Sequence, residues 1–442
     1  MKRKLRSWYL RMFLSPGYRS AQRLRVEIRR LISKRPHVVI AFLQLDDPWS
    51  YLLSHALRDL AAHYSVELRV CLSRALGGEF MPEPDSQAAH AIRDCRLLAR
   101  ELGLAFLDKG NAPPVEYREN LLDLLAQAQG RDDFADTFFQ ALGAYWRGDG
   151  ESAARLTGRL RAGRSRATAS IAGNQSLLRR LGHYGSATVF YGGEWYAGVE
   201  RLVYLCERLD TLRAHRGKGG EEVTAVAALS RLSHPNLPAV VPDGARNLPP
   251  LALYYSFRSP YSYLALHRVF SIADAYGVEI DVRPVLPMVM RGLPVPREKI
   301  LYIVQDASRE ARRLGIPFGK ICDPLGTGAE RCIAVFFHAR SQRKERAFMH
   351  SAGRAIWSEG IDVATDDGMR LVAERAGLSW PGVASAMADE SWGETVQDNR
   401  HWLTEAGLWG VPAFVIGDVA LWGQDRIWLL ARQLEYMCRG DG

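Results

Sequence analysis

Hydrophobic and polar positions follow the same order in the two halves of the chain. Each half begins with an alternating apolar run, continues with an amphipathic helical pattern and then shows a second apolar run. The expected elements are strands at 38–44 and 251–257, helices at 50–64 and 262–276, and second strands at 66–70 and 278–283. A strand–helix–strand order predicts a right-handed crossover and a parallel strand pair.

A long stretch of mainly helical pattern follows in each half, and a pair of short strands bounded by glycines closes it. The closing pairs are expected at 188–191 with 194–196 and at 413–416 with 419–422, before final helices that begin at Val199 and Gln424. The sequence therefore predicts an α/β fold of two thioredoxin-like units, each with a helical domain inserted in its middle.

The sequence itself repeats, which supports this division. Asp47-Pro-Trp-Ser-Tyr-Leu52 matches Ser259-Pro-Tyr-Ser-Tyr-Leu264 at an offset of 212 residues, and the same offset aligns Asp94 with Asp306. Later matches keep an offset of 225. Such ordered matches indicate a tandem duplication. The expected boundaries are a basic helical arm at 1–35, a first copy at 36–212, a Gly- and Pro-rich linker at 213–248 with one short helix, and a second copy at 249–442.

The turn before the first helix of each copy is the first candidate for chemistry. Ser259 is a suitable N-cap and Pro260 a suitable first helical residue, so a well-capped helix is the simplest interpretation. In thioredoxin-like units, however, this turn normally carries C-x-x-C, and here both thiols are replaced. A hydroxyl at a helix N-terminus can donate to an external thiolate, while the helix dipole lowers the pKa of that thiol. Because a carboxylate at Asp47 would repel a thiolate, we expect only the second copy to be active.

Two further motifs of the second copy favour the same interpretation. Gly410-Val411-Pro412 precedes a strand, where thioredoxin-like proteins carry a cis-proline that faces the turn. The backbone before such a proline can pair with a bound extended peptide. At the start of the last helix, backbone N–H groups suit a carboxylate, and Gln424 and Asp425 are candidates to hold an ammonium group. Asp425 is equally well explained as an acid that complements the helix dipole.

Together these residues resemble the 2-hydroxychromene-2-carboxylate isomerase and kappa-class glutathione transferase family, within the DsbA-like thioredoxin superfamily. The resemblance covers essentially all of 250–440 and implies glutathione as a cosubstrate. It also implies that Ser259 donates a hydrogen bond to the glutathione sulfur. Val411, beside Pro412, would pair with the cysteinyl unit, and Gln424 and Asp425 would hold the γ-glutamyl end.

The resemblance implies a glutathione-dependent isomerase or transferase that acts on an aromatic or other electrophilic small molecule. In the isomerases, the thiolate adds reversibly to the substrate and opens its ring, so that a bond can rotate before the thiol leaves. A non-catalytic thioredoxin-like binding or scaffold protein is the alternative. A thiol–disulfide oxidoreductase is a further one, although the chain has no C-x-x-C pair.

One segment departs from the family pattern, which usually has an Asn-x-Pro-Pro-like stretch after the second strand. Here residues 286–299 offer three basic candidates for the glycyl carboxylate of glutathione, namely Arg291, Arg297 and Lys299. The same segment carries apolar residues that suit either a substrate pocket or the core: Met288, Val289, Met290 and Leu293.

Composition and charge restrict the remaining possibilities. The chain of 442 residues is 47% hydrophobic, as packed domains are. Residues 1–35 hold twelve basic side chains against Glu27, a net +11 against +9 for the whole chain, so residues 36–442 carry −2. This distribution excludes a broad nucleic-acid face on the body. We expect the arm either to pack as a helix on the first copy or to contact an acidic surface or a membrane.

The six cysteines show neither metal-ligand spacing nor paired motifs, so we expect no metal site, buried thiols and a reducing, cytoplasmic location. No apolar run approaches the length of a membrane span. The two copies are expected to pack as a pseudo-dimer within the chain.

Overall fold

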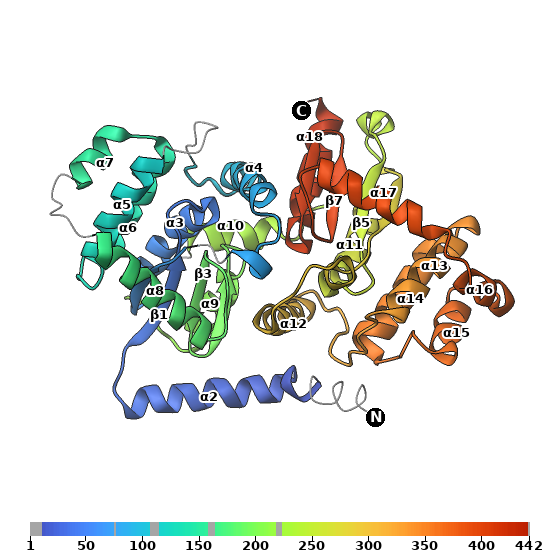
Figure 1. Ribbon diagram of the computed structural model, residues 1–442, viewed down its shortest axis with the longest axis horizontal. Helices are drawn as coiled ribbons and strands as arrows, with labels where there is room; N and C mark the ends of the chain where they lie inside the picture. The colour runs from blue at the N-terminus through green and yellow to red at the C-terminus, as the bar shows by residue number, and fades with distance from the viewer. Residues whose placement is uncertain (1–10, 75–76, 107–114, 158–163, 218–222, 441–442) are drawn as a thin grey trace. The chain divides into compact units, whose positions relative to one another are not determined.

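The computed structural model describes residues 11–74, 77–106, 115–157, 164–217 and 223–440 (Figure 1). The chain divides into two compact units, one formed by Ala21–Leu232 and the other by Ser233–Gly442 with Met1–Ser20; we call them the N-terminal and C-terminal units. The first ten residues of the expected basic arm, and residues 218–222 of the expected linker, lie outside the described residues.

The N-terminal unit contains a four-stranded sheet in the order β2-β1-β3-β4. β1 and β2 are parallel and joined through α3, whereas β3 is antiparallel to both β1 and β4. The strands and flanking helices are β1 (His37–Leu43), α3 (Pro48–His63), β2 (Val66–Leu72), β3 (Thr188–Tyr191), β4 (Glu194–Ala197) and α9 (Leu202–Thr211). The inserted helices are α4 (Pro84–Leu102), α5 (Val115–Ala128), α6 (Phe134–Arg147), α7 (Gly150–Thr157) and α8 (Arg164–Arg180), after the short turn η1 (Gly78–Phe80).

The C-terminal unit repeats this topology, with the sheet order β6-β5-β7-β8 and the same sense of every pairing. Its strands and flanking helices are β5 (Leu251–Tyr255), α11 (Pro260–Tyr276), β6 (Ile280–Pro284), β7 (Ala413–Ile416), β8 (Val419–Trp422), η5 (Gln424–Arg426) and α18 (Ile427–Arg439). The inserted elements are η3 (Met288–Arg291), α12 (Arg297–Arg313), α13 (Thr327–Ser341), α14 (Glu345–Arg354), the π-helical turn η4 (Ala355–Glu359), α15 (Asp366–Arg375), α16 (Trp380–Met387) and α17 (Trp392–Glu405). Figure 1 shows the orange helices α13–α16 grouped beside the sheet.

The predicted α/β class with two thioredoxin-like units is confirmed, and most expected elements lie within two residues of the observed ones. The starts of the last helices were wrong. Residues 424–426 form a separate 3-10 turn, because the Arg426 N–H donates to the Gly423 carbonyl three residues back, and α18 begins at Ile427. In the first copy, α9 begins at Leu202 rather than at Val199.

The core of the C-terminal unit lies on both faces of β5, whose five residues are all buried. Full burial is typical of a central strand that is covered on two sides. One buried cluster includes residues of β5 and packs against the loop before β7. It consists of Ala252, Tyr254, Val285, Leu403, Leu408 and Ala413, with Val411, Val415, Ala420 and Trp422 partly buried against it. The loop is therefore held by packing from the sheet and from α17.

The segment expected as a linker is folded over much of its length. The expected short helix is α10 (Thr224–Leu232), which packs against α3 and α9 of the N-terminal unit. Further on, η2 (Asp243–Asn247) packs against α18 of the C-terminal unit. Gly244 makes the closest approach there, since a Cβ at this position would lie 2.0 Å from the Cys438 carbonyl oxygen. The described part of the segment is thus attached to one unit or the other.

The six cysteines all lie among the described residues and form no disulfide. Four are buried as expected, but Cys322 and Cys438 are only half-buried, because one lies in the loop after α12 and the other in the last turn of α18. None of the described helices combines the length and the apolar character that crossing a membrane requires.

Candidate functional site

The turn between β5 and α11 places Ser259 at the start of a helix. Ser259 is the N-cap, with an extended backbone (φ −93°, ψ 115°), and its Oγ accepts a hydrogen bond from the Ser262 N–H at 3.1 Å. Pro260 occupies the first turn, where its missing N–H is not needed. The first turn of α11 contains no acidic residue. The helix itself therefore places no carboxylate in its first turn that would offset the positive end of its dipole.

The loop before β7 faces this turn. The Val411–Pro412 peptide bond is cis, as expected from the sequence. Ser259 Oγ donates to the Val411 carbonyl oxygen at 3.3 Å, which joins two segments far apart in the chain. The Gly423 N–H donates to the Pro412 carbonyl oxygen at 2.9 Å, so the turn before α18 reaches the same place. The three motifs of the second copy thus meet around one loop.

Two tryptophans form a wall beside this loop. The ring centroids of Trp409 and Trp422 lie 4.4 Å apart. Gly410 lies between them in such close contact that a Cβ would stand 2.4 Å from Cζ2 of Trp422, so this position requires glycine. Trp409 is buried, whereas Trp422 is only half-buried and presents part of its ring to solvent.

The structure separates the three basic candidates of the 286–299 segment. Arg291 Nη2 donates to the Trp409 carbonyl oxygen at 3.2 Å, which places η3 against the loop. Arg297 is exposed at the start of α12, and burial lowers the pKa of Lys299. Arg291 is thus joined to the loop by a hydrogen bond.

The apolar residues of this segment are not core residues, although packing was the simpler expectation. Met288, Val289, Met290 and Leu293 are all only half-buried, and η3 contains no buried residue. The same segment contacts the loop through Arg291, so these residues are candidates for a substrate surface there.

Gln424 was expected to hold the γ-glutamyl end of glutathione, but its side chain is bonded within the protein. Its side chain is 1% exposed, and both ends of its amide are bonded within the protein. Arg268 Nη1 donates to Gln424 Oε1 at 2.9 Å, and Gln424 Nε2 donates to Glu310 Oε2 at 2.7 Å. In this structure the Gln424 amide therefore supports the start of α18 from α11 and α12 and is not presented to a ligand. Asp425 remains partly exposed, with 27% of its side chain accessible.

Sequence reasoning missed two side-chain contacts around the turn. Arg258, next to Ser259, forms a bidentate pair with Asp323 at 2.8 and 3.1 Å. Tyr261 donates from its hydroxyl to Asp306 Oδ2 at 2.8 Å. The repeated acid at positions 94 and 306 was a signal for the second contact, because Trp49 Nε1 donates to Asp94 Oδ2 at 2.7 Å in the first copy.

The equivalent turn of the N-terminal unit has different chemistry. Asp47 is the N-cap of α3 and is buried, and its Oδ2 accepts from Ser50 Oγ at 2.6 Å and from Ser186 Oγ at 3.1 Å. Burial raises the pKa of Asp47 to about 6, although these hydrogen bonds act in the opposite direction. Ala187 stands where the second copy has Pro412 and has a positive φ of 50°.

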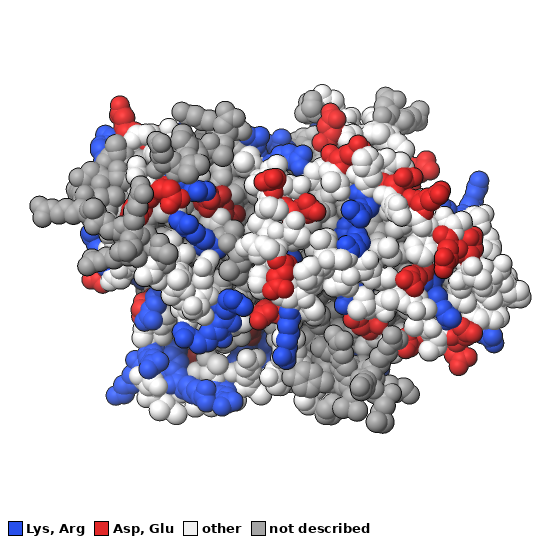
Figure 2. Space-filling model, in the orientation of Figure 1, with Lys and Arg blue, Asp and Glu red and all other residues white. Residues whose placement is uncertain are grey.

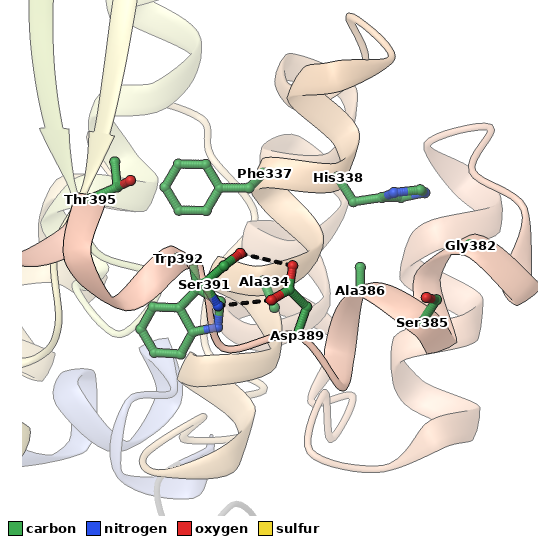
Figure 3. Close-up of a pocket in the computed structure, with 10 residues that line it drawn as sticks. All are labelled: Ala334, Phe337, His338, Gly382, Ser385, Ala386, Asp389, Ser391, Trp392 and Thr395. Atoms are coloured by element: carbon green, nitrogen blue, oxygen red, sulfur yellow. Dashed lines mark hydrogen bonds between the residues drawn. The ribbon is translucent and has the colours of Figure 1, made fainter.

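A cavity of about 470 Å³ lies elsewhere in the C-terminal unit, among α13, α16 and the start of α17 (Figure 3). Phe337 and Trp392 line one part of it, and Asp389, also in the lining, accepts hydrogen bonds from the Ser391 N–H and Oγ. None of the candidate residues around the Val411–Pro412 loop lines this cavity. It is therefore separate from the candidate site.

Comparisons with known proteins agree with the fold of the C-terminal unit. The DSBA-like thioredoxin domain family matches residues 251–435. The 2-hydroxychromene-2-carboxylate isomerase of Pseudomonas putida is 27% identical over 194 residues, which cover 42% of this chain and 94% of that protein. The isomerase of the same name from Sphingobium xenophagum is 27% identical over 182 residues, or 39% of this chain and 92% of that protein.

Among solved structures, a 2-hydroxychromene-2-carboxylate isomerase is 26% identical and covers 43% of this chain and 97% of its own, with a TM-score of 0.38. The two curated isomerases cover about two fifths of the present chain, and the family model matches within the C-terminal unit. The C-terminal unit therefore matches the DSBA-like thioredoxin domain family over residues 251–435 and is similar to the 2-hydroxychromene-2-carboxylate isomerases.

Proposed function

We propose that the C-terminal unit binds glutathione and acts as a glutathione-dependent isomerase or transferase on an aromatic or other electrophilic small molecule. The observation that carries this proposal is the position of Ser259 Oγ, at the N-terminus of α11 and 3.3 Å from the Val411 carbonyl across the loop. When bound, glutathione supplies a thiolate nucleophile. The isomerase relatives support the same class of reaction.

The chemistry expected of Ser259 follows from its hydrogen bonds. Its contact with the Val411 carbonyl is longer than the 2.5–3.0 Å typical of O–H···O bonds, so the hydroxyl hydrogen is weakly held. The Ser262 N–H meanwhile keeps Oγ in place as an acceptor. A thiolate in front of the turn is a stronger acceptor than a carbonyl, so the hydroxyl rotates to donate to it. Together with the helix dipole, this contact stabilises the charged form of the thiol.

The surrounding residues fit the rest of a γ-glutamyl tripeptide. We assign the cysteinyl unit to the backbone of Val411, just before β7. The partly exposed carboxylate of Asp425 suits the α-ammonium group, while Gln424 positions the turn that carries it. We assign the glycyl carboxylate to the Arg291 guanidinium, because Arg291 contacts the loop through the Trp409 carbonyl oxygen. The half-buried apolar residues of η3, with the ring of Trp422, suit an aromatic substrate.

The two alternatives make different demands on the chain. A thiol–disulfide oxidoreductase needs a reactive thiol. Burial strongly raises the pKa of Cys332, which disfavours its thiolate, so this alternative would depend on Cys322, which is half-buried in a loop. A non-catalytic binding protein needs only the peptide-binding edge, and the N-terminal unit already lacks the serine and the proline. Binding of glutathione without turnover would support this second alternative.

The decisive experiment is calorimetric titration of the full chain with reduced glutathione, combined with ultraviolet absorbance of the bound thiolate as a function of pH. We expect binding at millimolar glutathione or below. Ser259→Ala should raise the pKa of the bound thiol, because a hydrogen bond to a charged group contributes about 1.5–3 kcal/mol. Asp425→Asn should weaken binding without changing that pKa. The Ser271→Ala variant, on the same helix, is the matched control.

Turnover is tested with 2-hydroxychromene-2-carboxylate as the probe, with and without glutathione. Glutathione-dependent turnover that Ser259→Ala reduces at least about tenfold, the rate equivalent of about 1.4 kcal/mol, supports the enzyme. Absence of glutathione binding, or binding and thiol pKa that are the same in Ser259→Ala and Ser271→Ala, would refute the proposal.

A further inference from the structure

Helix α2 (Pro16–Ile32) carries an apolar stripe that faces solvent. Its large apolar residues Leu24, Ile28, Leu31 and Ile32 are between 46% and 78% exposed, and the helix has no buried residue. They follow the spacing i, i+4, i+7 and i+8, which brings them onto one side of a helix. An amphipathic helix of a globular protein normally turns this side toward the core.

The opposite side of α2 attaches it to the N-terminal unit. Arg23 forms a bidentate pair with Glu194 on β4, at 2.6 and 2.8 Å. The side chains of Gln22 and Val26 lie against Gly193 in the preceding turn. These positions are roughly half a turn around the helix from the apolar stripe. The Arg23–Glu194 pair and the contacts with Gly193 thus hold α2 by the side opposite its apolar stripe, which leaves the stripe facing solvent.

Basic side chains flank the apolar stripe. Arg25, Arg29 and Lys34 are exposed and form no ion pair among the described residues. The acid of this helix, Glu27, is already bound to Arg30 at 2.6 Å. Figure 2 shows Lys and Arg side chains gathered over α2. A partner that binds the apolar stripe must therefore offer an apolar region next to negatively charged groups.

We propose that α2 binds the surface of an anionic lipid bilayer and lies in the plane of its headgroups. The apolar stripe would enter the boundary between headgroups and acyl chains, while Arg25, Arg29 and Lys34 contact anionic headgroups. A second copy of the chain fits less well, because it would bring together two arms that each carry a net charge of +11 over residues 1–35. With 17 residues the helix is about 25 Å long, and it lies on the bilayer rather than crossing it.

The test is flotation of the full-length protein with vesicles of phosphatidylcholine and phosphatidylglycerol, compared with pure phosphatidylcholine vesicles. We expect binding to the anionic vesicles that weakens as salt is added. Leu24→Gln/Leu31→Gln removes apolar area without changing charge, and Arg25→Gln/Arg29→Gln does the reverse. Each should weaken binding about tenfold or more. The control is Val240→Gln, at a residue that is 80% exposed elsewhere in the chain, and it should bind as the unaltered protein does.

Several outcomes would overturn the proposal. These are no binding to anionic vesicles at low salt, equal binding by the Leu24→Gln/Leu31→Gln and Val240→Gln variants, or equal binding to both kinds of vesicle. Light scattering without lipid provides a further check, since a dimer that Leu24→Gln/Leu31→Gln dissociates would assign the stripe to a second copy. The assay requires no glutathione, so its result is independent of the proposed activity.

Discussion

Ser259 and Asp47 occupy the same position in the two units but have opposite relations to charge. Ser259 is half-buried, and its Oγ accepts a hydrogen bond from a backbone N–H. Its hydroxyl can still donate a hydrogen bond to a thiolate. Asp47 is buried beneath Ser50 and Ser186, which both donate to it. An anion placed at the N-terminal turn would be stabilised at Ser259 and repelled by ionised Asp47. A single replacement therefore explains why we assign the chemistry to one unit.

The buried carboxyl of Asp47 makes stability depend on pH. Its pKa is about 6 in the folded protein and 3.8 ordinarily, so its contribution to stability is complete below pH of about 4 and is lost as pH rises through about 6. The change amounts to about 3 kcal/mol. Urea unfolding of the wild type and of Asp47→Asn between these pH values should show the variant gaining on the wild type as pH rises. Asp418→Asn, at an exposed acid, controls for net charge, and a constant difference between wild type and Asp47→Asn would contradict the assignment.

At the scale of elements, α12 fixes the geometry of the site without contributing to its surface. Asp306 on this helix accepts from Tyr261 in the first turn of α11 and from Arg309 at 2.6 Å. One residue after Arg309, Glu310 accepts from Gln424 in η5. The inserted helical domain thus holds both the start of α11 and the turn before α18. The first copy keeps the contact between α3 and α4 with a tryptophan as the donor.

We expect that removing the Tyr261–Asp306 hydrogen bond weakens both stability and glutathione binding, whereas removing the equivalent bond in the N-terminal unit weakens stability alone. Tyr261→Phe deletes the hydroxyl that reaches Asp306, and should lower the free energy of unfolding by about 1 kcal/mol. It should also weaken glutathione binding, because the start of α11 is no longer held. Trp49→Phe is the matched variant in the N-terminal unit; it removes the donor to Asp94 and should reduce stability alone. Urea unfolding and calorimetric titration measure the two effects, and weaker glutathione binding in both variants would count against this role.

At the scale of the whole molecule, the two units repeat one sheet topology around separate cores. The N-terminal unit carries the buried acid and residues 21–32 of the basic helix α2, whereas the C-terminal unit carries the serine, the cis-proline loop and the apolar residues of η3. The duplication therefore provides one unit whose turn is suited to thiol chemistry. The other unit has the same fold but lacks the serine and the cis-proline at the equivalent positions.

This division predicts that a ligand acts on one unit. Glutathione at ten times its Kd should stabilise the C-terminal unit by about 1.4 kcal/mol and raise its unfolding temperature in differential scanning calorimetry. The transition of the N-terminal unit is identified by its response to Asp47→Asn and should not move with glutathione. If glutathione shifted only the unfolding transition of the N-terminal unit, the binding site would lie in that unit and the proposal would be contradicted.

The sequence by itself determined the fold class, the repeat of one topology and the position of the candidate turn. Strand alternation, the Ser-Pro helix start and the Gly-Val-Pro motif depend on backbone conformation close to each residue, and so local residue types suffice to predict them. The repeat offset added long-range information, because it compares two versions of the same fold within one chain.

Only the tertiary structure decided which side chains are available at the site and on the surface. Gln424 is covered because Arg268 and Glu310 arrive from two other helices, and Arg291 is distinguished from Arg297 by its contact with Trp409. The helical pattern of 16–32 likewise does not reveal that its apolar side faces outward. Burial depends on which segments pack together, and residues far apart in the chain determine that packing.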